Sequence, residues 1–139
     1  MSALFDQAVS SYLRNTAPAG LGYPFSVGMI FNLKAVGGSA RTLWALSDTA
    51  TSTNYFSLRM SAAEAFVLVT ASSVVGEDII ATAGASINPD KWHFGIGRFL
   101  SPTNRRLSFL NANGNYTFGN STGNFNPSGF DVMTIGAIS

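Results

Sequence analysis

Residue types that often do chemistry in proteins are scarce in this chain, and His93 is its only histidine. A catalytic triad or a metal site would have to be built around it. A metal ion would need further histidine or cysteine ligands, and the chain has no cysteine. Residues 119–123 have the G-x-S-x-G spacing of a serine nucleophile, but no helix is predicted after them, as the strand-to-helix turn of that motif requires. We therefore predict that His93 is a structural residue at a sheet surface.

The carboxylates do not form the pair that glycoside hydrolysis requires. That reaction needs two carboxyl groups at a set separation, which Glu64, Glu77 and Asp78 do not provide by their spacing. Calcium needs several oxygen ligands with net negative charge. To supply them, three distant aspartates would have to converge: Asp6, Asp48 and Asp131. The sequence thus predicts no catalytic residue, no metal ligand and no cofactor.

The strongest candidate for recognition is the polar segment of residues 111–126, which combines asparagines with aromatic side chains. Amides and exposed aromatic rings together bind sugars by hydrogen bonding and stacking, although the same composition describes an ordinary long loop. Arginines are further candidates because the planar guanidinium makes several hydrogen bonds at an interface. The candidate interaction residues are Arg105, Arg106, Tyr116, Phe118, Asn124 and Phe125.

Short predicted strands position these residues. Residues 92–99 and 105–110 read as two strands joined by a turn at residues 101–104, with Trp92, Phe94 and Ile96 on one face and His93 on the other. Gly95 and Gly97 are predicted to be sheet glycines that a bulky neighbour approaches closely. Residues 64–71 fit helix or strand, and their β-branched residues favour strand. Further strands are predicted at residues 10–14, 25–33, 42–46, 56–60, 78–82, 116–118 and 130–135.

Length and composition narrow the function classes. The 139 residues suit a single domain, residues 1–139, with 46% hydrophobic residues to build a core. Only 11% of residues are charged and the net charge is +1, which gives no field to recruit nucleic acid or an anionic membrane. The N-terminal residues lack a signal-peptide pattern. We therefore expect a protein that is made and folded in a cytoplasm, without nucleic-acid or membrane partners.

Four stretches, in order, resemble the laminin-G-like or concanavalin A-like jelly-roll family. They comprise residues 4–6 with 10–13, 25–31 with 41–48, 91–94 with 105–107, and 131–137, and the third contains the Trp92-His93 pair typical of the family. The resemblance implies an all-β fold, an antiparallel two-sheet jelly-roll sandwich. It also implies one of the roles that this fold serves, which are glycan binding, adhesion and structural roles in virions.

One departure from the family pattern concerns the last strand. Relatives continue past the Ile-Gly strand into one more strand, whereas this chain stops at Ser139. We therefore expect one sheet to have a short or missing edge partner, which is a template for pairing with another chain. The alternative is that the N-terminal segment or a loop covers that edge.

Together these features predict a non-enzymatic structural interaction protein. We expect it to dock on and stabilise a larger assembly as a bacteriophage capsid decoration or cement protein, located in the virion, which bridges subunits of the major capsid protein and self-associates. The alternative is a glycan-binding, lectin-like module of a tail or adhesin.

Overall fold

The computed structural model describes residues 13–16, 22–34, 38–51, 53–82 and 87–136. They form β-strands and turns, without any helix in the described ranges. The strands are β1 (Leu13–Asn15), β2 (Phe25–Asn32), β3 (Arg41–Ser47), β4 (Tyr55–Met60), β5 (Phe66–Ser72), β6 (Gly76–Ala81), β7 (Trp92–Ser101), β8 (Asn104–Leu110), β9 (Tyr116–Ser121) and β10 (Val132–Ile135).

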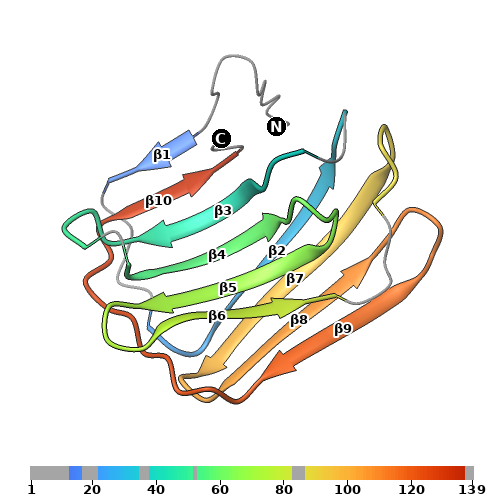
Figure 1. Ribbon diagram of the computed structural model, residues 1–139. Helices are drawn as coiled ribbons and strands as arrows, with labels where there is room; N and C mark the ends of the chain where they lie inside the picture. The colour runs from blue at the N-terminus through green and yellow to red at the C-terminus, as the bar shows by residue number, and fades with distance from the viewer. Residues whose placement is uncertain (1–12, 17–21, 35–37, 52, 83–86, 137–139) are drawn as a thin grey trace.

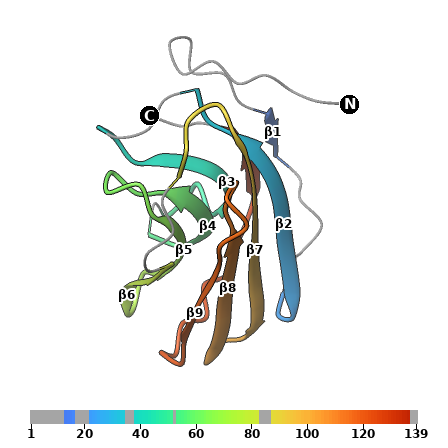
Figure 2. The ribbon, with the colours of Figure 1, turned by 90° about the vertical axis from the view of Figure 1, so that its right-hand side faces the viewer.

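The strands form two antiparallel sheets that pack face to face (Figures 1 and 2). The six-stranded sheet has the order β1-β10-β3-β4-β5-β6, and the four-stranded sheet has the order β2-β7-β8-β9. This arrangement confirms the predicted all-β, antiparallel two-sheet jelly-roll sandwich. The choice of strand is also confirmed for residues 66–71, because β5 lies between β4 and β6 with all its residues buried, while residues 64 and 65 belong to the turn before it.

The edge strands of the six-stranded sheet test the expectation that one sheet has a short or missing edge partner. β10 is not left open, because β1 pairs with it through Leu13↔Ile135, Arg14↔Thr134 and Asn15↔Met133. The N-terminal part of the chain thus covers this edge with a strand of three residues. Residues 10–12, which were also predicted to be strand, lie outside the described residues.

On the opposite side, β6 and β9 approach each other and close the sandwich. Gly119 makes this approach possible, because a Cβ there would lie 2.6 Å from Ile80 Cγ2 and 2.9 Å from the carbonyl oxygen of Ala81. The two sheets therefore meet along β6 and β9, where a side chain at position 119 would force them apart.

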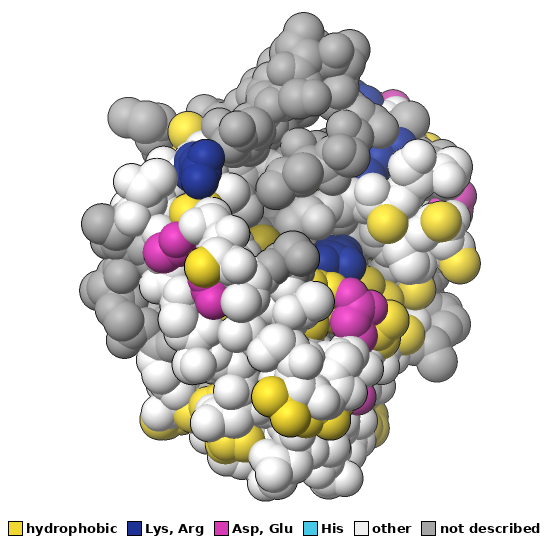
Figure 3. All heavy atoms as spheres, turned by 60° about the vertical axis from the view of Figure 1, so that its left-hand side comes forward, with side chains coloured by type: hydrophobic (Ala, Val, Ile, Leu, Met, Phe, Trp, Pro, Cys, Tyr) yellow, Lys and Arg dark blue, Asp and Glu magenta, His cyan; other side chains and the backbone are white. Residues whose placement is uncertain are grey.

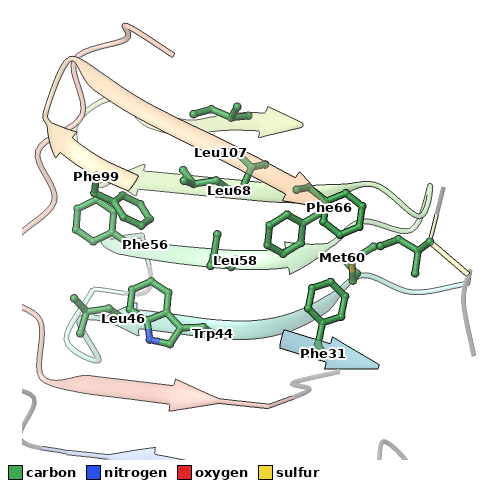
Figure 4. Packing of buried hydrophobic residues seen from close by; sticks show 13 residues of the cluster. Phe31, Trp44, Leu46, Phe56, Leu58, Met60, Phe66, Leu68, Phe99 and Leu107 are labelled. Atoms are coloured by element: carbon green, nitrogen blue, oxygen red, sulfur yellow. The ribbon is translucent and has the colours of Figure 1, made fainter. Parts of the chain in front are cut away.

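Aromatic rings fill the core between the sheets (Figure 4). Phe66 of the six-stranded sheet stacks on Phe31 and Phe109 of the four-stranded sheet, with ring centroids 5.6 and 5.3 Å apart. His93 belongs to the same group and stacks on Phe31 and Phe109 with both centroid distances at 5.7 Å. One end of the core is therefore a stack of flat side chains from both sheets.

The position of His93 corrects the sequence prediction of a histidine at a sheet surface. Only 2% of His93 is exposed. Its Nε2 lies 3.0 Å from the carbonyl oxygen of Asn88, and its Nδ1 accepts the backbone N–H of Ala112 at 3.2 Å. Both ring nitrogens are thus engaged, which lets a polar ring sit in an apolar core. The prediction that His93 is structural fits these contacts.

The glycines of β7 explain why this side of the strand faces inward. A Cβ on Gly95 would lie 2.3 Å from Phe66 Cζ, and a Cβ on Gly97 would lie 2.8 Å from Leu58 Cδ2. Large side chains of the opposite sheet therefore occupy the space above both glycines. This confirms the prediction that they are sheet glycines with bulky neighbours, and it turns Trp92 and Phe94 to the outside.

Candidate functional site

The face of the four-stranded sheet that points away from the core, which we call the outer face, carries large exposed apolar side chains. Along β7, buried and exposed residues alternate, with His93 and Phe99 inside and Trp92 and Phe94 outside. β2 and β9 alternate between partly buried or buried and exposed residues, and β8 alternates except at Ser108, which is outward but buried. We define the outer face by its outward side chains: Ile30, Trp92, Phe94, Ile96, Arg98, Arg106, Ser108, Leu110, Tyr116, Phe118 and Asn120.

Strand register aligns these side chains in rows across the sheet. The first row runs Ile30, Phe94, Leu110, Tyr116 through the pairs Ile30↔Phe94, Phe94↔Leu110 and Leu110↔Tyr116. Each member is exposed, with Ile30 at 70% and Tyr116 at 61%. Directly opposed side chains on one face of a sheet touch their neighbours. The row is therefore a continuous apolar strip across all four strands.

The next row contains two small residues, Gly28 and Ser108, that contact aromatic rings of the first row. Gly28, Ile96, Ser108 and Phe118 are aligned by register. The Phe94 ring lies 3.7 Å from the position of a Cβ on Gly28. In the same way the Tyr116 hydroxyl donates to Ser108 Oγ at 2.9 Å, across the sheet. Phe118 at 71% and Trp92 at 65% remain the most exposed rings of this face.

The third row is charged. Arg98 and Arg106 stand directly opposite each other on β7 and β8, and Asn120 follows on β9. Together with Tyr116 and Phe118 they line a hollow of about 740 Å³ that extends to the turn between β7 and β8. The outer face thus combines an apolar strip with a cationic pair at one end.

The structure brings three of the six predicted interaction residues to this face: Arg106, Tyr116 and Phe118. Asn124 is exposed but lies in the segment after β9, and it does not line the hollow. The sequence interval of two residues placed Tyr116 and Phe118 on the same side of β9.

Arg105 and Phe125 lie inside the protein and are left out of the candidate site. The Arg105 side chain is fully buried, and its Nη2 donates to Asp78 Oδ2 at 2.6 Å and to the carbonyl oxygen of Gly123 at 2.8 Å. Its Nη1 donates to the carbonyl oxygen of Pro102. The Phe125 ring packs on this guanidinium, with 5.1 Å between Arg105 Cζ and the ring centroid. Arg105 therefore ties the segment after β9 to β6 and β8, which is a structural role.

Two of the three aspartates considered for calcium do converge. Asp131 accepts the backbone N–H of Thr49 at 2.8 Å and also the Thr49 hydroxyl, while Asp48 accepts Thr51 Oγ1 at 2.7 Å. Asp6 lies outside the described residues. Within the described part of the chain, no three acidic, histidine or cysteine side chains form a group that could hold a metal ion. The two carboxylates are engaged in fastening the 48–51 turn to the start of β10.

These contacts give a pH prediction. The hydrogen bond from the Thr51 side chain lowers the pKa of Asp48, and the bond from the Thr49 side chain lowers the pKa of Asp131, both from a usual value of 3.8. The unfolded chain therefore binds protons first as the pH falls, so both carboxylates stabilise the fold above that value and lose this contribution below it. Urea unfolding at a series of acidic pH values is expected to show this loss. The D48N/D131N variant should show a flatter acid profile, and an unchanged profile would contradict the assignment.

Sequence reasoning missed the apolar part of the site. Ile30, Trp92, Phe94 and Leu110 were treated as strand residues, and Arg98 was not singled out. The sequence does indicate that Trp92 and Phe94 share one face of the strand, because they alternate with His93 and Gly95. Both alternating sets could be read as the buried side, and only the packing of Phe66 over Gly95 decides between them.

No protein-family model matches the chain, and no curated protein matches it in sequence. In the described ranges there is no helix with the length and apolar character to cross a membrane.

On the side of the molecule shown in Figure 3, charged side chains are few and scattered, and hydrophobic ones form small separate groups. The outer face, with its aligned apolar side chains and arginine pair, is the feature of the molecule from which we argue a function.

Proposed function

We propose that this chain is a non-enzymatic docking protein, which attaches through the outer face of its four-stranded sheet to another protein of a larger assembly. The observation that supports this proposal is the apolar strip from Ile30 to Tyr116, continued by Trp92 and Phe118. Contiguous exposed apolar patches of this kind mark protein interaction surfaces. Aromatic side chains and arginine are also the residues that dominate binding energy at interfaces.

In its specific form, the proposal is a decoration or cement protein of a virion shell, which is one of the roles that the family resemblance implies. A protein that binds only the assembled shell raises the stability of that shell by mass action. Repetition of the contact by symmetry adds avidity when one copy touches two shell subunits. The outer face would then lie against the shell and bridge neighbouring subunits.

The non-enzymatic part of the proposal rests on how the reactive groups are used. Both nitrogens of His93 are engaged in the core. Asp78 pairs with Arg105, and Glu77 accepts the hydroxyl of Tyr55. These groups hold the structure together and are committed to partners within the chain.

A glycan-binding module is the second candidate, because Tyr116, Phe118 and Asn120 line one hollow. Aromatic stacking combined with an amide is a usual way to bind a sugar ring. The row of Ile30, Phe94 and Leu110, however, offers no hydrogen-bonding side chain, so sugar hydroxyl groups buried against it would lose their bonds to water without replacement. An apolar protein partner fits this row better.

Photo-crosslinking tests the docking proposal directly. Benzoylphenylalanine is introduced at position 118, on the outer face, and separately at position 79 as the control. Ile79 is 58% exposed and lies on the outward side of the six-stranded sheet. In the cells or particles that contain the chain, we expect the chain labelled at position 118 to crosslink to one other protein. The chain labelled at position 79 should crosslink to none. The same adducts from both positions, or none from position 118, would contradict the proposal.

Truncation of the exposed rings gives the matching affinity prediction. W92S/F118S is expected to weaken binding of the crosslinked partner by at least about thirtyfold, because truncating one central aromatic costs about 2 kcal/mol. The free energy of unfolding should change by less than about 0.5 kcal/mol, since both rings are exposed in the free chain. I79S is the control and should bind like the wild type. Equal binding by W92S/F118S and I79S, measured by biolayer interferometry, would overturn the outer face as the docking site.

A further inference from the structure

Arg98 and Arg106 form an uncompensated cationic pair on the outer face. They stand directly opposite each other across β7 and β8, and both are exposed. Like charges at directly opposed positions of a sheet destabilise it. In the described part of the chain, the ion pairs are Lys34–Asp90 and Arg105–Asp78, and neither the Arg98 nor the Arg106 side chain has a hydrogen-bonding partner there. The pair is thus held at the surface without an internal counter-charge.

The face itself offers no carboxylate to this pair. The four strands that build it, β2, β7, β8 and β9, contain neither aspartate nor glutamate. A second copy docked face to face would bring two more arginines and no acid from these strands. Charge complementarity therefore points to a different chain, whose contact surface is acidic.

We infer that the docking partner presents a short apolar segment with a carboxylate that binds between Arg98 and Arg106. This inference rests on the docking function proposed above and names the chemistry of its partner. Two guanidinium groups side by side suit a carboxylate, because charge-assisted hydrogen bonds to it are short and strong. Asn120 lies next in the same row and adds an amide donor to the clamp.

The geometry of the face also sets the spacing within the partner segment. Arg98 lies four residues from Phe94 along β7, which is roughly 13 Å in an extended strand. An extended segment along this strand would place its acidic residue about four positions from the apolar side chain that contacts Phe94. Phe118 and Tyr116 would flank the segment on the side of β9.

Selection from a random linear peptide display library tests the inference with a defined probe. The immobilised chain is the target, and the enriched peptides are then synthesised with each Asp or Glu kept or changed to Asn or Gln. We expect enriched peptides to carry an acidic residue near an aromatic or aliphatic one. We also expect the amide versions to bind at least about tenfold more weakly, with affinity falling as salt rises.

The matching variants separate the inference from the docking function. R98Q/R106Q should weaken binding of the acidic peptides at least about tenfold and remove the salt dependence, while it leaves folding intact. R14Q is the control, since Arg14 is exposed on β1 of the other sheet. Peptides that need Trp92 and Phe118 but carry no acid would overturn the inference and leave the docking function standing. Peptides insensitive to both sets of substitutions, no enrichment at all, or binding of acidic glycans on an array instead of peptides would overturn both.

Discussion

Replacing Gly95 by alanine is expected to cost about 3 kcal/mol of unfolding free energy, because overpacking a tight core typically costs 1–3 kcal/mol and occasionally more. A Cβ at this position would lie 2.3 and 2.4 Å from two atoms of the Phe66 ring. Phe66 has no exposed surface and stacks on Phe31 and Phe109, so the ring has no free space to enter. The new methyl group must therefore push β7 away from β5. Urea unfolding followed by tryptophan fluorescence measures the loss.

Gly28 supplies the matched control on the neighbouring strand. A Cβ there would meet Phe94 at 3.7 Å, which is an ordinary van der Waals contact on the outer face. Gly28→Ala should therefore stay within about 0.5 kcal/mol of the wild type, or stabilise the fold slightly by restricting the unfolded chain. If both alanine variants unfold at the same urea concentration, the inward orientation of Gly95 is wrong, and so is the outward orientation of Trp92.

Replacing Asp78 by asparagine is expected to cost about 3 kcal/mol, because breaking a buried ion pair from one side leaves the other charge without compensation. The Arg105 side chain is fully buried and the Asp78 side chain is 21% exposed, with 2.6 Å between Nη2 and Oδ2. The guanidinium keeps its carbonyl partners at Pro102 and Gly123. These dipoles do not neutralise a full charge, so the fold is weakened around the segment after β9.

Asp90 provides the control for this substitution. It pairs with Lys34 at 2.9 Å, but the two side chains are 80% and 62% exposed for Lys34 and Asp90. Exposed ion pairs contribute at most about 1 kcal/mol, so Asp90→Asn should lower the free energy of unfolding by no more than about 1 kcal/mol. Asparagine also tolerates the positive φ of 58° at this position. Equal losses for Asp78→Asn and Asp90→Asn would contradict the structural role of Arg105.

Most of the fold follows from local patterns in the sequence. Alternation in residues 25–33 and the turn chemistry at residues 101–104 correctly predicted β2 and the hairpin of β7 and β8. The β-branched residues correctly decided the ambiguous segment that became β5. These signals are local because a strand with one buried face needs apolar residues at every second position. Their regular succession was sufficient to predict a two-sheet sandwich.

The orientation of β7 could not be predicted in the same way. Glycine contributes nothing to a hydrophobic pattern, so Gly95 and Gly97 gave no sign that they face the core. The space above them is filled by Phe66 and Leu58 from the other sheet, which is a tertiary fact. The sequence pattern therefore allowed the interpretation that Trp92 is buried, although this residue is 65% exposed.

The candidate site was predicted in part for a similar reason. Alternation puts Arg105 and Arg106 on opposite faces of β8, but it does not say which one is inside. Arg105 is buried because Asp78 and Gly123, which are 27 and 18 residues away, converge on it. Phe125 was predicted to be an interaction residue of the polar segment 111–126, but its ring packs on the same buried guanidinium. Such long-range compensation leaves no local trace in the sequence.

The central claim is that the outer face of the four-stranded sheet is the surface by which this chain docks. Determining the structure of the chain within its native assembly, by electron cryomicroscopy, tests it most directly. We predict that another chain covers Trp92, Phe94 and Phe118, and that the contact buries more than roughly 1,000 Å² in total. An assembly in which these three side chains stay exposed to solvent, while other surfaces of the chain make the contacts, would contradict the claim.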